Sequence, residues 1–476
     1  MEEQKSHIVI FPFLAHGHIN AFISLASLLR HCNSNLTITF VSTARHIQSV
    51  RSSLPFSSSI QFHSLPFSPE SHGLPPNTES MADLQLPQFL TFLYATESLQ
   101  PAFDDFISTV ASDAASRGTK VAIVSDLFLG WTVEVARKYR VYHSVFLTTS
   151  CYGAAIFLSL WINLPHTETT SDWFSLPEYP DIIIHRSQLS KPLLMANGTD
   201  LWSVFQRREL SLCCKTDSML VNTVEELERK WLDMVARTLE IPIFSIGPLV
   251  GGLNSKNPSS GTEIIDWLDI HPPASVLYIS FGSQYSIQKN QMLELALGLE
   301  ASRRPFIWVI RPPLGFDAKH EFKDEWLPDG FVKRMKEENR GFFLHGWAPQ
   351  VAILSHKSTG AFLSHCGSNS VLESLNSGVP IIGWSLGAEQ PFNVTILTEL
   401  GVCVEMARGN LETSEIKKEK VADVVEMVMG DNKKGRDMRE KAKEISEILI
   451  RAWNEESSSS AKGLAEFFKL IWGVFG

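Results

Sequence analysis

The chain has 476 residues, of which 44% are hydrophobic and 20% charged, and this composition is typical of a globular protein with a sizeable core. At about 100 to 200 residues per domain, the length allows two or three domains, and we expect two. The formal net charge of −10 argues against nucleic acid and anionic membranes as partners.

The first residues and the cysteines indicate a cytoplasmic protein. The chain begins MEEQKSHIVIF, with two acids and no long apolar core, so we expect no secretory signal. The most apolar stretch, Ala154 to Leu164, is shorter than the about 18 to 20 residues that cross a bilayer, so we expect no membrane insertion. The six cysteines show no C-x-x-C spacing and are interpreted as reduced thiols.

The first half of the chain alternates short β-branched runs with amphipathic helical stretches. A strand at His7 to Phe11 is followed by a helix from about Asn20 to His31 and a second strand at Leu36 to Val41. A buried strand at Val121 to Ser125 leads into Asp126 and another amphipathic helix. This alternation predicts βαβ units and a parallel sheet.

A second α/β series follows a stretch rich in Gly, Pro, Ser and Asn, IGPLVGGLNSKNPSSG, which has the composition of a linker. The expected strands of this series are Val276 to Ser280, Phe306 to Ile310, Gly341 to Leu344, Ala361 to Ser364 and Val379 to Ile382. We therefore predict two doubly wound α/β domains that face each other across a cleft. The expected divisions are an N-terminal domain at 1–250, a linker at 251–262, a C-terminal domain at 263–455 and a helical tail at 456–476.

The segment FLSHCGSNSVLESLNSGVP places a strand end, a tight turn and a helix N-terminus in succession. Gly367 permits close backbone approach, and His365 adds a hydrogen-bond donor. Ser368, Asn369 and Ser370 bring hydroxyls, an amide and free backbone N–H groups to a position where the helix dipole favours an anion. A capped helix without a ligand is the alternative, because Ser and Asn are preferred caps.

Two further positions suggest a nucleotide. Glu373 lies about one turn into the same helix, where an acid can hold ribose hydroxyls, although it would also stabilise the helix dipole. Trp347, in the motif HGWAPQ, is a flat platform for a base, and Ala348 and Gln350 offer hydrogen bonds to the base edge. Core packing is the more common role of a tryptophan, and the residues alone leave both interpretations open.

The stretch from Trp347 to Gln390 resembles the signature box of plant UDP-dependent glycosyltransferases of secondary metabolism. WAPQ, HCG, NS, the glutamate that follows, GVP and the closing EQ all fall at the spacing of that family. The resemblance extends to FPFLAHGH near the start, to the Asp126 loop, and to WLD and SVLYISFGS after the linker. It implies a GT-B fold of two Rossmann-like domains, with the acceptor on the first, the UDP-sugar on the second and the tail packed back on the first.

The resemblance also implies an inverting transfer of sugar from UDP-sugar, a co-substrate, to a small acceptor, by a monomer without a cofactor. Trp347 would stack on uracil, with Ala348 and Gln350 at its edge, and Glu373 would bind the ribose. The residues implied for the diphosphate are Ser283, His365, Asn369 and Ser370, with Gly367 and Ser368 in the same loop. Those implied for the sugar hydroxyls are Glu389 and Gln390, and Thr148 is implied to contact the sugar or its phosphate.

Ser368 departs from the family, which usually has a tryptophan between the glycine and the asparagine. Because that tryptophan borders the donor sugar, the departure leaves the identity of the sugar open. UDP-glucose is favoured, since Glu389 and Gln390 match the glucose-using members. A pentose donor such as UDP-xylose is the alternative.

Transfer to an alcohol needs a base, and histidine, with an ordinary pKa of about 6.5, suits this task. His18 matches the catalytic position of the family, whereas His16 is interpreted as lining the pocket. Asp126 would accept a hydrogen bond from His18 and stabilise the imidazolium, and a helix N-cap is its alternative role. No D-x-D motif occurs, so we expect no metal, with the helix dipole and His365 stabilising the diphosphate.

Other functions are less consistent with these residues. An NAD-dependent oxidoreductase would need G-x-G-x-x-G after its first strand, which the chain lacks. A nucleotide-sugar-binding protein without activity is disfavoured by the intact His18 and Asp126. Aromatic side chains suit a flat acceptor such as a flavonoid or triterpenoid, or a glycoside whose sugar is extended. The expected acceptor-pocket residues are Phe13, His16, Phe89, Phe128, Phe157, Trp161, Trp202 and Phe392.

Overall fold

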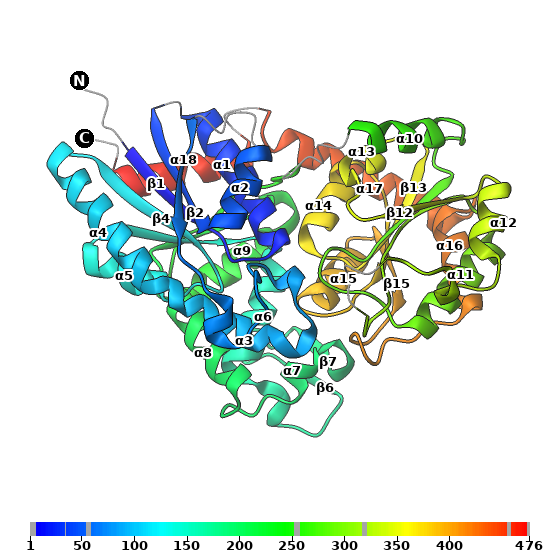
Figure 1. Ribbon diagram of the computed structural model, residues 1–476, viewed down its shortest axis with the longest axis horizontal. Coiled ribbons are helices and arrows are strands. Elements are labelled where there is room, and N and C mark those ends of the chain that lie inside the picture. Colours follow the sequence, from blue (N-terminus) through cyan, green and yellow to red (C-terminus); the bar gives the residue numbers. More distant parts are fainter. Residues whose placement is uncertain are drawn as a thin grey trace.

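The computed structural model describes residues 6–33, 35–53, 59–251, 258–316, 321–454 and 458–473. Two α/β domains lie side by side in Figure 1, the first at the left and the second at the right. Half of the expected linker, residues 252–257, lies outside the described residues, and the chain is described again from α10 (Pro258–Asp269).

The first domain is built on a seven-stranded parallel sheet in the order β3-β2-β1-β4-β5-β8-β9. Its strands are β1 (Ser6–Phe11), β2 (Leu36–Thr43), β3 (Gln61–Leu65), β4 (Lys120–Asp126), β5 (Tyr142–Leu147), β8 (Ser218–Val221) and β9 (Ile243–Ser245). The central strands are almost wholly buried, because helices cover both faces of a parallel sheet.

The second domain has a six-stranded parallel sheet in the order β12-β11-β10-β13-β14-β15. Its strands are β10 (Val276–Ser280), β11 (Phe306–Ile310), β12 (Gly341–His345), β13 (Thr359–Ser364), β14 (Ile381–Trp384) and β15 (Cys403–Ala407). In both sheets the strand order reverses at one point, between β1 and β4 and between β10 and β13. The predicted pair of doubly wound α/β domains is confirmed.

Helices pack on both faces of the two sheets (Figure 1). Those of the first domain are α1 (His16–Cys32), α2 (Ala44–Ser53), α3 (Phe89–Ala95), α4 (Gln100–Arg117), α5 (Thr132–Tyr139), α6 (Cys151–Asn163), α7 (Lys191–Leu194), α8 (Leu201–Cys213) and α9 (Glu225–Leu239). Those of the second are α11 (Lys289–Ser302), α12 (Phe331–Glu337), α13 (Gln350–Leu354), α14 (Ser368–Asn376), α15 (Gln390–Glu399), α16 (Lys418–Met429) and α17 (Lys433–Arg451). Helix α1 begins four residues before the expected start at Asn20, so its first turn carries His16 and His18.

The last helix, α18 (Ser459–Trp472), returns to the first domain. Its side chains Leu464, Phe467 and Ile471 are buried in the same hydrophobic cluster as Ile8 and Ile246. The Ser460 hydroxyl donates to the carbonyl of Gly247, next to β9. The tail thus covers the sheet of the first domain after the chain has completed the second.

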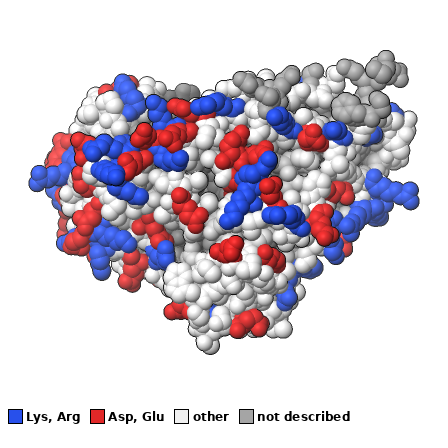
Figure 2. Space-filling view, turned by 180° about the vertical axis from the view of Figure 1, so that it is seen from behind, with Lys and Arg blue, Asp and Glu red and all other residues white. Residues whose placement is uncertain are grey.

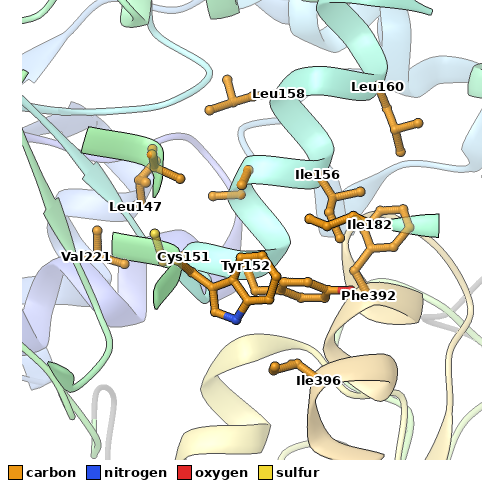
Figure 3. Close-up of a cluster of buried hydrophobic side chains, with 14 of the residues drawn as sticks. Leu147, Cys151, Tyr152, Ile156, Leu158, Leu160, Ile182, Val221, Phe392 and Ile396 are labelled. Carbon is orange, nitrogen blue, oxygen red and sulfur yellow. The ribbon is translucent and has the colours of Figure 1, made fainter. Parts of the chain in front are cut away.

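A hydrophobic cluster joins the two domains through α6 and α15. In Figure 3, Tyr152 and Ile156 of α6 point toward Phe392 and Ile396 of α15, and all four side chains are buried. This packing explains why Ala154 to Leu164 is so apolar, because α6 is covered by its own domain and by the other one. No helix in the described part of the chain is both long and apolar enough to cross a membrane.

Candidate active site at the domain junction

The strand order brings the predicted site residues of each domain to one edge of its sheet. Phe11 at the end of β1 pairs with Ser125 of β4, so the loop that leads to His18 at the start of α1 begins beside Asp126. In the second sheet Ser280 of β10 pairs with Ser364 of β13. In open α/β sheets, ligands bind outside the carboxyl ends of the strands at such a reversal point.

His18 and Asp126 form a hydrogen-bonded pair. Nδ1 of His18 lies 2.7 Å from Oδ2 of Asp126, whose side chain is only 1% exposed. The other carboxylate oxygen, Oδ1, accepts the backbone N–H of Phe128 at 3.1 Å. Asp126 does not cap α5, whose N-cap is Trp131. Both oxygens of Asp126 are therefore engaged, and one of them orients His18.

The surroundings of His18 favour its protonated form. Burial lowers the pKa of the imidazole, but the charge and hydrogen bond of Asp126 and the charge of Glu389 outweigh burial and raise the pKa above 6.5. When Nδ1–H donates to Asp126, Nε2 carries the lone pair. His18 can therefore accept a proton at Nε2, and Asp126 can stabilise the resulting imidazolium.

A series of aromatic rings begins at His18 and continues into α6 and α8. The rings of Phe13 and Phe128 each lie 5.6 Å from the imidazole of His18 and 5.2 Å from each other, between centroids. Phe157 of α6 lies 6.0 Å from Phe128. The series continues through Trp161 to Trp202, with successive separations of 6.4 Å. The structure therefore brings five of the expected acceptor-pocket residues into one series of rings, of which Phe13 and Phe128 lie beside His18.

The other three expected acceptor residues are not part of this series of rings, although Phe89 packs in the same hydrophobic cluster as Phe13. His16 faces Trp347 of the second domain, with 5.9 Å between the ring centroids. Phe89 faces Tyr285, also of the second domain, at 6.5 Å. Phe392 is 1% exposed and packs in the cluster between α6 and α15 (Figure 3), so the structure does not bring it to the aromatic series. An apolar residue at the domain interface has the same sequence pattern as one that lines a pocket.

In the second domain, the imidazole of His365 lies between two glycines. A Cβ atom at either Gly282 or Gly367 would be 2.5 Å from Nε2 of His365, and Gly282 also has a φ of +74°. Burial lowers the pKa of His365 to about 4, with a smaller contribution from the charge of Arg311. His365 is therefore neutral at neutral pH and contributes an N–H group rather than a positive charge.

Replacing Gly367 with alanine is expected to weaken UDP binding by about tenfold, because the methyl group would push the imidazole of His365 out of place, and overpacking costs about 1 to 3 kcal/mol. The affinity is measured by calorimetry and the melting temperature by scanning calorimetry. An unchanged affinity in the folded variant would contradict this account of the glycine.

Four side chains of the second domain form a network beside Trp347, which is 50% exposed. The Tyr278 hydroxyl donates to Oε1 of Gln350 at 3.0 Å. Nε2 of Gln350 then donates to Ser370 at 2.9 Å and to Glu373 at 2.7 Å. Gln350 therefore lies beside the acid expected at the ribose, and Tyr278 sets the orientation of its amide.

The N-terminus of α14 is linked to the first domain. The Ser368 hydroxyl donates to Thr149 at 2.7 Å and receives a hydrogen bond from Asn393 at 3.2 Å. The side-chain nitrogen Nδ2 of Asn369 donates to the carbonyl of Gly17, in the turn that carries His18, at 2.7 Å. We use the term domain junction for this region, where Thr149 meets Ser368 and Gly17 meets Asn369.

The residues expected at the sugar lie at the junction as well. The Ser368 hydroxyl is 3.4 Å from Oε1 of Glu389, and burial raises the pKa of that carboxyl group. Oε1 of Gln390 accepts the backbone N–H groups of Leu386 and Gly387, at 2.9 and 3.1 Å, so this oxygen holds the preceding turn. The remaining expected residues, Thr148, Ser283 and Ala348, are partly exposed in loops at the ends of β5, β10 and β12.

Three residues of the candidate site were not predicted from the sequence. Thr149, rather than its neighbour Thr148, contacts Ser368. Tyr278 lies in the apolar strand motif SVLYIS, where a hydroxyl needs a partner. Tyr285 follows Ser283 closely, and a Cβ at Gly387 would lie 3.3 Å from its hydroxyl, next to Glu389. A polar atom in an otherwise apolar motif is the signal that could have identified Tyr278, whereas the polar segment around Tyr285 gives no such signal.

Comparisons with known proteins identify the family of this chain. Residues 4–251 match the family model "Glycosyltransferase, N-terminal domain", and residues 211–443 match "UDP-glucoronosyl and UDP-glucosyl transferase". UDP-glycosyltransferase 92A1 of Arabidopsis thaliana is 39% identical over 97% of this chain and 96% of its own length.

Two solved structures are similar over nearly the whole length. That of Glycyrrhiza uralensis UGT73P12 complexed with glycyrrhetinic acid 3-O-monoglucuronide has a TM-score of 0.84 and 26% identity, and covers 99% of this chain and 96% of that one. That of Medicago truncatula UGT71G1 complexed with UDP-glucose has a TM-score of 0.82 and 27% identity, and covers 98% of both chains. The chain belongs to the UDP-dependent glycosyltransferases of plants and has their GT-B fold of two Rossmann-like domains.

Proposed function

We propose that this enzyme transfers glucose from UDP-glucose, with inversion, to a hydroxyl group of a small lipophilic plant metabolite. The observation that supports this most strongly is the His18–Asp126 pair, at 2.7 Å, at the start of a series of aromatic rings. A base beside an apolar surface suits an alcohol or phenol carried on a flat ring system.

In the proposed reaction, Nε2 of His18 takes the proton from the acceptor hydroxyl as its oxygen attacks the anomeric carbon. A bond forms between this oxygen and the anomeric carbon, and the bond from that carbon to the diphosphate oxygen breaks on the opposite face. UDP leaves with the electron pair, and the sugar has inverted configuration. Asp126 holds Nδ1 of His18 and stabilises the imidazolium, as in catalytic dyads.

For the donor, we propose that Trp347 stacks on uracil and that Ala348 contacts the base edge. Gln350 hydrogen-bonds Glu373, which supports a position for Gln350 at the ribose rather than at the base. The residues proposed for the diphosphate are Ser283, His365, Asn369 and Ser370, and those proposed for the sugar are Glu389, Gln390 and Thr148. The Medicago truncatula structure, complexed with UDP-glucose, supports the choice of donor.

For the acceptor, we propose a flavonoid or triterpenoid, either as an aglycone or as a glycoside that is extended. The Glycyrrhiza uralensis structure contains glycyrrhetinic acid 3-O-monoglucuronide. This ligand supports the proposal of an acceptor that has a polycyclic ring system and already carries a sugar. The experiment is a matrix of UDP-sugars against flavonoid and triterpenoid acceptors, read by mass spectrometry. Products with UDP-glucose and at least one of these classes are expected, and turnover confined to small aliphatic alcohols would contradict the proposal.

We propose that this protein acts as a cytoplasmic monomer whose partners are UDP-sugar and acceptor. On the face shown in Figure 2, Lys and Arg side chains are interspersed with Asp and Glu, without the broad basic area that nucleic acids require. Light scattering of the purified enzyme at its working concentration tests the oligomeric state.

Catalysis is expected to proceed without a metal ion. Among the described residues, no group of three or more His, Cys, Asp or Glu is arranged to hold one, and the chain lacks a D-x-D motif. Addition of EDTA should therefore leave the initial rate of transfer unchanged. A rate that falls with EDTA and returns with Mg²⁺ would contradict this prediction.

Replacing Ser368 with tryptophan is expected to change the ratio of kcat/KM for UDP-glucose to that for UDP-xylose by more than about fivefold, with little change in affinity for UDP. The hydroxyl of Ser368 lies 3.4 Å from Glu389, and an indole there would fill space beside the donor sugar. Pocket changes of this size shift discrimination by about 1 to 3 kcal/mol. Equal responses of the two donors would mean that Ser368 does not border the sugar.

A further inference from the structure

Arg311 places a mostly buried positive charge behind the proposed diphosphate site. It follows β11 directly, and β11 pairs with β10, so its side chain starts at the sheet edge where the loop of Ser283 begins. Nη1 of Arg311 donates to the carbonyl of Ser283 at 2.7 Å, and Nη2 donates to the carbonyl of Tyr285. The guanidinium group thus holds this loop at two carbonyl groups, those of Ser283 and Tyr285.

The described part of the chain supplies no acid to balance this charge. Arg311 donates hydrogen bonds to the carbonyl groups of Ser283 and Tyr285, and burial alone lowers the pKa of its guanidinium, with no contribution from a nearby carboxylate. Arg340, in the same domain, shows the usual arrangement. It donates to the carbonyls of Leu299 and Glu300, but it also forms an ion pair with Glu338 at 2.9 Å. A buried cation without a counter-charge is unfavourable unless a ligand supplies that charge.

The diphosphate is a ligand that would do so. No positive charge comes from the four residues proposed to bind it, since His365 is neutral at neutral pH. These residues are Ser283, His365, Asn369 and Ser370. Arg311 lies close enough to His365 to influence its titration, and it supports Ser283 from behind. The charge of Arg311 therefore lies near both of the loops that would bind the phosphate groups.

We propose that Arg311 is a positioning residue for the donor, which fixes the Ser283 loop and balances the negative charge of the diphosphate without contacting the sugar or the reacting atoms. This inference rests on the donor site given under Proposed function. It predicts a selective effect: loss of the charge should weaken ligands that carry the diphosphate and spare uridine, which has the base and ribose alone.

The experiment measures the affinities of UDP and uridine by calorimetry for the wild type, Arg311→Gln and Arg311→Lys. In Arg311→Gln, binding of UDP should weaken by at least about tenfold and that of uridine by less than about twofold, because a partly screened charge several ångströms away is worth about one power of ten. Arg311→Lys, which keeps the charge, should retain the ratio of the two affinities within about threefold. Arg340→Gln is the matched control and should leave the ratio unchanged.

Each outcome has a separate meaning. If folded Arg311→Gln loses affinity for UDP and uridine equally, or for neither, the proposal is overturned. If Arg311→Gln does not fold, Arg311→Met, which also removes the charge, takes its place. A selective loss of affinity for UDP in that variant would support the role of charge, and an unchanged affinity ratio would overturn it. If the wild type binds neither ligand, the proposed donor site itself is wrong, independently of Arg311.

Discussion

Replacing His18 with alanine is expected to lower kcat for transfer to an alcohol by at least about 100-fold, the usual scale for loss of a general base. Nε2 of His18 is the proposed proton acceptor, and Nδ1 is held by Asp126 at 2.7 Å. UDP should still bind, since the residues proposed for the nucleotide come from the second domain. Initial rates and calorimetric UDP affinities measure the two effects separately.

In His18→Ala, the rate of transfer to acidic phenols should fall less than the rate of transfer to alcohols, because acidic phenols ionise without a general base. The matched control is His46→Gln, which alters another buried histidine of the first domain, whose Nε2 lies 2.7 Å from the carbonyl of Glu79. This control should keep transfer within a few-fold of the wild-type rate. Near wild-type turnover of alcohols by His18→Ala would rule out its role as the base.

The pairing of His18 with Asp126 could be predicted because both residues lie close to strand ends. Continuous apolar runs identify β1 and β4 as buried parallel strands, and the carboxyl ends of such strands meet at one edge of the sheet. The same reasoning brings the loop after β10 next to His365, after β13. Pairs of site residues at the ends of neighbouring strands can therefore be predicted from the sequence, once the strand order of a doubly wound sheet is assumed.

Contacts between the domains could not be predicted in this way. Phe392 looks like a pocket residue in the sequence, yet it packs against α6, because hydrophobic pattern does not distinguish an interface from a cavity. The bond from Ser368 to Thr149 joins residues far apart in the chain and depends on how two domains meet. Arg311 gave no signal either, since an arginine after a strand is ordinary until its lack of a counter-charge is known.

Replacing Asp126 with asparagine is expected to lower kcat by at least about tenfold while the affinity for UDP is kept. An amide carries no charge to stabilise the imidazolium of His18 and does not enforce the tautomer with a lone pair on Nε2. The melting temperature should change little. The reason is that the amide oxygen of asparagine can still accept the N–H of Phe128, which Oδ1 of Asp126 accepts at 3.1 Å. A sharp fall in melting temperature with unchanged activity per folded molecule would indicate a purely structural role.

The dependence of kcat/KM on pH tests the same pair more directly. In the wild type, His18 must lose its proton before it acts as a base, and its pKa is raised by Asp126, so activity should fall at low pH with a midpoint above about 6.5. In Asp126→Asn the charge that raises this pKa is gone, and the midpoint should move to lower pH. The control Asp83→Asn removes another carboxylate of the first domain, which pairs with Arg45 at 2.6 Å, and should leave the midpoint unchanged. A midpoint that stays in place in Asp126→Asn would show that Asp126 does not act on the titration of the catalytic base.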